Sequence, residues 1–212
     1  MNDELARINI SRYIANFNCS ELFPWDGNRP WNITFTASKI VMEIIQGLPS
    51  EYDVSDGIAL HQSAIIEDGS ILKAPVVIGP RCYVAAGAYL RGGGWLQGDC
   101  IIGPGSELKS SFMFSGSKLA HLNFVGDSII GERVNLEAGS IIANYRNEWS
   151  NHDIKIRDDG RLFCIGIDKF GALVGDGARI GANSVIAPGA LIEPDTVVGR
   201  LTLIDQCSAL SA

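Results

Sequence analysis

The sequence predicts an all-β fold, a parallel β-helix of hexapeptide repeats that follows a short helical segment. Apolar residues recur at every sixth position from Leu60 to Phe114, and again from Val174 to Val198. A glycine or another small residue often follows the repeated aliphatic. Residues six apart would lie on different faces of a helix. A coil with three short strands per turn instead turns each repeated aliphatic inward and uses glycine to relieve the corners.

Residues 1–54 do not share this six-residue period, and we predict that they form an N-terminal helical cap or extension. An amphipathic pattern from Leu5 to Tyr13 and a second one from Ala37 to Gln46 predict two helices. A turn-rich stretch with two tryptophans, Phe23 to Trp31, separates them. We expect this segment to cover the open end of the repeat array, where strand edges would otherwise be exposed.

Residues 55–212 are predicted to form the β-helix domain, with one phase slip. The repeat loses its frame between Gly116 and Asp127, and it resumes with Phe124, Ile130, Leu136 and Ile142. His121 lies in this interval. A local break in a regular array points to a functional site.

An insertion of about residues 146–170 interrupts the coil. It is rich in charged side chains around a predicted Asp159-Gly160 turn, and apolar residues alternate on both sides of that turn. This alternation predicts a projecting, hairpin-like loop. Long insertions in regular arrays are commonly functional.

The composition is that of a soluble globular protein, with 212 residues, 46% hydrophobic and 19% charged. No apolar run approaches the ~20 residues that cross a bilayer, and the N-terminus lacks a signal-peptide pattern, so we expect a cytoplasmic protein without a membrane segment. The net charge of −7 without a basic stripe argues against nucleic-acid binding. The cysteines form no CxxC pair and are read as small buried hydrophobes: Cys19, Cys82, Cys100, Cys164 and Cys207.

The stretch from Lys109 to Tyr145 carries a specific motif. Its matching positions are Gly116, Ser117, Lys118, His121, Leu122, Phe124, Gly126, Asp127, Ile130, Gly131, Asn135, Glu137, Ala138, Gly139, Ser140 and Asn144. These residues resemble the left-handed β-helix hexapeptide acyltransferases, in detail the acetyltransferase domain of bifunctional enzymes that acetylate and then uridylylate glucosamine-1-phosphate. The likeness covers roughly residues 86–199, and it is the source of the expected left-handed winding. It implies acetyl-CoA as co-substrate, no metal, and a homotrimer.

The resemblance assigns roles to eight residues. His121 falls on the catalytic base, a task suited to a side chain that titrates near neutrality. Asn144 falls on a catalytic amide near the acetyl group. Arg91 and Lys109 fall on basic positions that bind the substrate, where a sugar phosphate needs fixed positive charge.

The remaining assignments concern the sugar and the coenzyme. Phe124 and Asn135 fall on substrate-binding positions, and Tyr145 and Ala182 fall near the CoA arm. No cysteine is placed to carry an acyl group, so we expect direct transfer in a ternary complex.

Three departures from the family pattern bear on the acceptor. Phe124 replaces a tyrosine and thereby removes a hydroxyl. Glu137 replaces a glycine and adds a carboxylate. A lysine usual after Asn144 is absent, and Arg146, Lys155 or Lys169 are candidates to replace it.

These observations predict an acetyltransferase that acts on an amino-sugar phosphate, of the hexosamine-1-phosphate kind. A noncatalytic scaffold or regulatory subunit, and an O- or N-acetyltransferase for a nucleotide-linked sugar, are the alternatives. A carbonic anhydrase of this fold would need three converging histidines, and only His121 lies in the regular coil. About 55 residues before the coil are too few for a nucleotidyltransferase domain.

Overall fold

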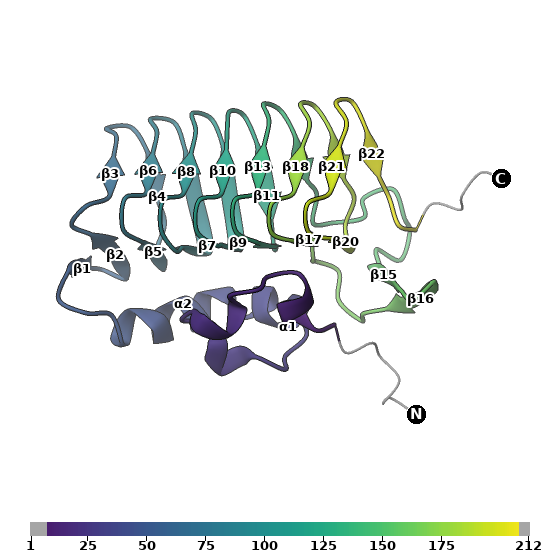
Figure 1. Ribbon diagram of the computed structural model, residues 1–212, viewed down its shortest axis with the longest axis horizontal. Coiled ribbons are helices and arrows are strands. Elements are labelled where there is room, and N and C mark those ends of the chain that lie inside the picture. The colour runs from purple at the N-terminus through teal and green to yellow at the C-terminus, as the bar shows by residue number, and fades with distance from the viewer. Residues whose placement is uncertain (1–7, 208–212) are drawn as a thin grey trace.

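The computed structural model describes residues 8–207 and shows a three-sided parallel coil with helices along one side (Figure 1). The predicted all-β class is confirmed, including the helical N-terminal segment and the projecting loop. Each turn of the coil contributes one strand to each of three faces, and neighbouring turns pair in parallel.

Two of the faces are open, and we name each after a lysine that it carries. The Lys118 face consists of β3 (Ile65–Ile66), β6 (Tyr83–Val84), β8 (Ile101–Ile102), β10 (Lys118–Leu119), β13 (Asn135–Leu136), β18 (Arg179–Ile180) and β21 (Val197–Val198). The Lys109 face consists of β4 (Ile71–Leu72), the first parts of β7 (Tyr89–Leu96) and β9 (Glu107–Met113), β11 (Phe124–Gly126), β14 (Ile141–Ile142), β19 (Val185–Ile186) and β22 (Leu203–Ile204).

The third face is the covered face. It consists of β2 (Ile58–His61), β5 (Val76–Ile78), the second parts of β7 and β9, β12 (Ile129–Ile130), β17 (Ala172–Val174) and β20 (Ala190–Ile192). Strand β1 (Tyr52–Ser55) pairs antiparallel with β2. Outward side chains on this face are large and apolar, among them Trp95, Phe112 and Leu173, and all three are buried. The coil therefore presents a second apolar surface on its outside.

The inner core follows the predicted period except at one corner. All repeated aliphatics from Val174 to Val198 point into the core. Met113 enters the core five residues after Leu108, and Ile130 enters five residues after Val125. The prediction that Phe114 and Phe124 point inward is therefore wrong.

The phase slips lie at the corner that follows the Lys109 face. Strand β9 runs through this corner, where Ser110 adopts a left-handed φ of 47° and the turn is one residue shorter. The pairing of β7 with β9 shifts register between Arg91 and Gly94 at the same place. His121 instead lies in a regular six-residue step from Leu119 to Val125.

The N-terminal segment lies along the covered face. It contains three single-turn 3-10 helices, η1 (Ile10–Arg12), η2 (Phe17–Cys19) and η3 (Phe23–Trp25), and two α-helices, α1 (Pro30–Phe35) and α2 (Ala37–Gln46). Helix α2 agrees with the prediction, whereas α1 was not predicted, and its first two residues were expected to belong to the loop. Of the first predicted helix, only Ile10–Arg12 is helical, and residues 1–7 lie outside the described part of the chain.

The helices do not cover the end of the coil as expected. Helix α2 contacts β7 and β5, α1 contacts β9, and the 3-10 region reaches Asp176 and Glu193 near the far end (Figure 1). The outward apolar residues of the covered face need a partner along their whole length, which explains this placement. The division at residue 54 stays a prediction.

The insertion forms the predicted hairpin. Strands β15 (Lys155–Asp158) and β16 (Arg161–Cys164) pair antiparallel and project near the C-terminal end of the coil (Figure 1). The cysteines differ from expectation, because Cys82 and Cys100 are buried but Cys19 and Cys164 are exposed.

Candidate functional site

Asp127 joins two of the predicted site residues at one corner of the coil. Equivalent positions in successive turns, Gly92, Ser110, Asp127 and Asn144, form this Asp127 corner. The ammonium of Lys109 lies 2.6 Å from Oδ2 of Asp127. The side-chain amide of Asn144 donates to the same oxygen. The side chains of Lys109 and Asp127 are 17% and 7% exposed, so this carboxylate fixes two polar groups in a largely dry environment.

The backbone brings these groups close together. Asp127 adopts a left-handed φ of 46°, and its N–H donates to the carbonyl of Lys109 at 2.8 Å. A Cβ atom at Gly126 would lie 2.7 Å from Cγ of Asn144 and 2.9 Å from Cζ of Phe124. Glycine at this position therefore lets the ring of Phe124 and the amide of Asn144 occupy one site.

Arg91 lies beside Lys109 on the neighbouring strand of the Lys109 face. Its Nε and Nη2 both lie 2.7 Å from Oε1 of Glu107. The guanidinium also lies over the ring of Tyr89, 5.8 Å from its centroid. Arg91 and Glu107 are 37% and 28% exposed, so this ion pair is open to solvent, unlike that of Lys109.

His121 lies at a second corner, between the Lys118 face and the Lys109 face. His121, Ala138, Ala182 and Arg200 occupy equivalent positions in successive turns of this His121 corner. The backbone N–H of His121 donates to Oδ1 of buried Asn123 at 3.0 Å. The carbonyl of His121 accepts the N–H of Gly139 in the next turn at 2.9 Å. Within residues 8–207 the exposed imidazole has no hydrogen-bond partner. Its backbone is fixed while its ring is free to meet a ligand.

Glu137 occupies the same corner. Its carboxylate accepts the N–H of Ala182 at 2.9 Å and receives Nε and Nη2 of Arg200 at 2.9 and 3.0 Å. The hydrogen bonds from Arg200, followed by the Ala182 N–H, lower the pKa of Glu137. Glu137, which stands where the family has glycine, therefore occupies the backbone N–H of Ala182, a predicted coenzyme-binding residue.

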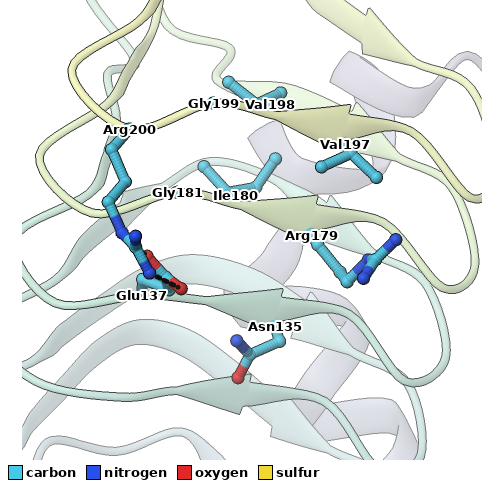
Figure 2. A pocket seen from close by; sticks show the side chains of 9 residues that line it. All are labelled: Asn135, Glu137, Arg179, Ile180, Gly181, Val197, Val198, Gly199 and Arg200. Atoms are coloured by element: carbon cyan, nitrogen blue, oxygen red, sulfur yellow. Dashed lines mark hydrogen bonds and ion pairs between the residues drawn. The ribbon is translucent and has the colours of Figure 1, made fainter.

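Asn135 lines a shallow hollow of about 260 Å³ on the Lys118 face. Arg179 and Val197 continue its row in the next two turns. Figure 2 shows Arg179 on one side of this hollow and the pair of Glu137 and Arg200 on the other.

Tyr145 stacks on His152, with ring centroids 4.7 Å apart. The next residue, Arg146, is fully buried and forms a two-point ion pair with Asp205, with both distances 2.8 Å. Burial disfavours its charge, but the hydrogen bonds that Arg146 donates to Asp205 and Glu148 more than offset this and raise its pKa. Arg146 thus anchors the insertion to the last turn and is not free to replace the missing family lysine.

The structure divides the predicted residues into two groups at opposite ends of β11. Lys109, Phe124 and Asn144 lie at or beside the Asp127 corner, with Arg91 on the next strand and Tyr145 directly after Asn144. The other group, at or beside the His121 corner, comprises His121, Asn135 and Ala182.

Two acidic residues that organise these positions, Asp127 and Glu107, were not predicted as site residues. Asp127 lies within the quoted motif, and a carboxylate one turn after a lysine was the available signal. Within residues 8–207, no three His, Cys, Asp or Glu side chains converge on a point that could hold a metal ion. No helix in this part of the chain could span a membrane.

No family model matches the chain. A bifunctional sugar-1-phosphate nucleotidylyltransferase/acetyltransferase from Sulfurisphaera tokodaii is 34% identical over 187 residues, which cover 82% of this chain and 46% of the relative. The bifunctional protein GlmU of Nitrosomonas eutropha is 35% identical over 150 residues, covering 71% of this chain and 30% of the relative. GlmU of Methanococcus vannielii is 26% identical over 187 residues, covering 85% and 44%. The chain therefore spans less than half the length of these relatives.

Proposed function

The chain belongs to the hexapeptide-repeat acyltransferases, as a homologue of the acetyltransferase portion of bifunctional sugar-1-phosphate nucleotidylyltransferases/acetyltransferases, and from this premise we propose that it transfers an acetyl group from acetyl-CoA to an amino-sugar phosphate. The observation that carries this proposal is the arrangement of the motif from Lys109 to Asn144. Lys109, Asp127 and Asn144 meet at one end of the short strand β11, and His121 lies near the other end.

The reaction forms a C–N bond between the sugar amine and the acetyl carbonyl carbon, and it breaks the C–S bond of the thioester. His121 accepts the proton that the amine loses and returns a proton to the leaving thiolate of CoA. Its exposed ring, with no partner among residues 8–207, suits this exchange.

Asn144 stabilises the negative charge that develops on the acetyl oxygen. A side-chain amide carries two N–H donors, and Asp127 accepts one of them. The second N–H is held in a fixed direction, as electrostatic stabilisation of an oxyanion requires. Asp127 is the positioning residue in this account, because it acts through Asn144 and Lys109.

Arg91 and Lys109 bind the phosphate of the acceptor in this proposal. The Arg91–Glu107 pair is partly exposed, so a phosphate can compete with Glu107 for the guanidinium. The side chain of Lys109 is less exposed than that of Arg91, and its ammonium contributes positive charge while it remains paired with Asp127. Phe124 provides an apolar surface beside Asn144, where it replaces a hydroxyl by an aromatic ring.

A homotrimer completes the site in this proposal. In one chain, the residues at the His121 corner and those at the Asp127 corner lie at opposite ends of β11. Packing of open faces would bring the His121 corner of one copy close to the Asp127 corner of a second copy. Both open faces carry exposed aliphatic residues that such packing would bury: Ile65, Ile71, Ile141, Val185, Val197 and Leu203. Exposed apolar surface of this kind favours association.

The test is acceptor-dependent release of CoA from acetyl-CoA. Glucosamine-1-phosphate and galactosamine-1-phosphate are compared with nucleotide-linked amino sugars, and the product is identified by mass spectrometry. Asn144→Ala is expected to lower kcat by about 10²–10³-fold, as for loss of an oxyanion donor. Asn147→Ala, which alters an exposed asparagine in the insertion, is the matched control and is expected to keep wild-type activity.

If only the nucleotide-linked sugars are acetylated, the acceptor is a nucleotide-linked sugar and not an amino-sugar phosphate. If acetyl-CoA does not bind, the proposal of an acetyltransferase is contradicted and a noncatalytic scaffold is favoured.

A further inference from the structure

Polar residues interrupt an otherwise apolar row on the Lys118 face. The outward positions of successive turns are Ile65, Tyr83, Ile101, Lys118, Asn135, Arg179 and Val197. The two cations and the amide are therefore three consecutive neighbours. Adjacent strands lie about 4.8 Å apart, so Lys118 and Arg179 start about 10 Å apart with Asn135 between them. Their long, flexible side chains can converge above this amide.

These two cations differ from those of the Lys109 face in having no counter-charge. Lys109 and Arg91 are each paired with a carboxylate. Lys118 and Arg179 are exposed, and among residues 8–207 neither side chain has a hydrogen bond or an ion pair. This local excess of positive charge lies on a chain whose net charge is −7. Focused positive charge of this kind concentrates anions from solution.

The hollow beside this row adds a second pair of groups. Arg200 lines it, and Glu137 holds two of the guanidinium donors. A guanidinium has five N–H donors, so three remain for a ligand. The lining of the hollow thus contains two guanidinium groups, one carboxylate and one amide, around a floor formed by Ile180 and Val198 (Figure 2).

We propose that Lys118, Asn135 and Arg179, together with the adjoining hollow at Arg200, form a phosphate-binding site. Lys118 and Arg179 contact the phosphate from two sides, and the Asn135 amide donates between them. Glu137 orients Arg200 and limits the net positive charge of the site. The group recognised is a phosphate ester, which either the sugar phosphate or the coenzyme can supply. The inference rests on the proposed function only for the choice of these two probes.

The site lies within reach of the His121 corner. His121 follows Lys118 by three residues in the same turn of the coil. Asn135 lies beside Lys118 in the next turn. Glu137 and Arg200 belong to or adjoin that same corner. A ligand whose phosphate rests on the Lys118 face can therefore extend around the corner toward the imidazole.

The experiment measures binding directly by calorimetry, independently of acetyl transfer. Full-length wild type, Lys118→Ala, Arg179→Ala and the control Arg161→Ala are titrated with two phosphate-bearing probes and their phosphate-free counterparts. Arg161 is exposed on the projecting hairpin and has no partner among residues 8–207. The probes are glucosamine-1-phosphate against glucosamine, and acetyl-CoA against acetyl-pantetheine. Inorganic pyrophosphate at low salt serves as a probe that needs no acetyltransferase function.

Each of the two site variants is expected to weaken a phosphate-bearing probe by about tenfold, the effect of one charge-assisted contact. The phosphate-free counterparts and Arg161→Ala should show no change. The probe affected identifies the source of the phosphate. Glu137→Gln should tighten binding of the same probe a few-fold and steepen its salt dependence, because it removes a negative charge from the hollow.

The proposal is overturned if Lys118→Ala and Arg179→Ala bind all probes, including pyrophosphate, as the wild type does. It is also overturned if these variants weaken phosphate-free and phosphate-bearing probes equally, or if they change only the oligomeric mass measured by light scattering. Pyrophosphate binding that depends on Lys118 and Arg179 would support the site even in a protein without acetyl transfer.

Discussion

Replacement of Asp127 by alanine tests the arrangement of the Asp127 corner. The substitution removes the one oxygen that receives both Lys109 and Asn144. It leaves the ammonium of Lys109 without a counter-charge in a site where its side chain is only 17% exposed. Breaking one partner of a buried ion pair costs about 3–5 kcal/mol. Lys109 retains some access to water, so we expect a loss near the lower end, about 3 kcal/mol in the free energy of unfolding.

The measurement is urea denaturation of a double-mutant cycle with Lys109→Met. Replacing both charges by apolar groups removes the unpaired ammonium. The double variant is therefore expected to recover a substantial part of the stability lost in Asp127→Ala. The exposed pair of Arg81 and Asp99 is the matched control, and its removal should cost at most about 1 kcal/mol. All three variants at the Asp127 corner should have much lower acetyl-transfer activity.

Two outcomes would refute this reasoning. If Asp127→Ala costs no more than the exposed control pair, the Lys109 ammonium is not desolvated as the burial implies. If Asp127→Ala is destabilised but transfers acetyl groups at the wild-type rate, Asp127 holds the fold and does not position Asn144.

Further predictions concern the covered face and its N-terminal partner. Trp95→Ala should destabilise the protein by about 3–5 kcal/mol, because Trp95 is 1% exposed between the coil and the helices. Phe35→Ala, at a site 69% exposed and outside both open faces, should cost less than about 1 kcal/mol in the same urea titration. A similar loss in both variants would mean that the helices do not bury this face. Burial, and next the charge of Glu193, raise the pKa of Tyr13 from 10.0 to about 12. The folded state thus favours the neutral phenol, and the resulting stability is complete below about pH 10 and is lost as pH rises through about 12. Tyr13→Phe should lose less stability than the wild type over this interval, and equal losses in both would contradict the assignment.

The sequence predicted the coil well because its period reflects a geometric repeat. Every residue of the series from Val174 to Val198 lies in the core, since each turn must fill the same interior space. The slips were misplaced for an equally physical reason. Met113 and Phe114 are both apolar, as are Phe124 and Val125, and either member fits an inward frame. The covered face is apolar on its outside as well as on its inside. Because both members of each pair are apolar, composition does not show which of the two faces the core.

The position of the helices could not be predicted from local patterns. The outward series that includes Trp95 and Leu173 is visible only once the register of the coil is known. Its partner comes from residues 8–46, which are distant in sequence. Helix α1 was not predicted because it begins inside the turn-rich stretch, at Pro30, although proline is well tolerated in a first helical turn.

The sequence motif named candidate site residues but not the contacts between them. The motif identified Lys109 and Asn144, yet the carboxylate that joins them becomes evident only when successive turns are stacked. The same holds for Arg146, which the sequence offered as a candidate to replace the missing family lysine. Its partner, Asp205, lies in the last turn, and the pair is buried. Charge states of a site depend on such long-range contacts, which a linear motif does not contain.

The most direct test of the central claim is the rate of acceptor-dependent CoA release in His121→Ala, with His61→Ala as a matched histidine control. His61 lies in β2 and contacts Tyr52 and Ser63, away from both corners. If His121 is the base of an acetyltransferase, its loss should lower kcat by about 10²–10⁴-fold, while His61→Ala stays near wild type. Retention of activity in His121→Ala within about tenfold of the wild type would contradict the proposed mechanism.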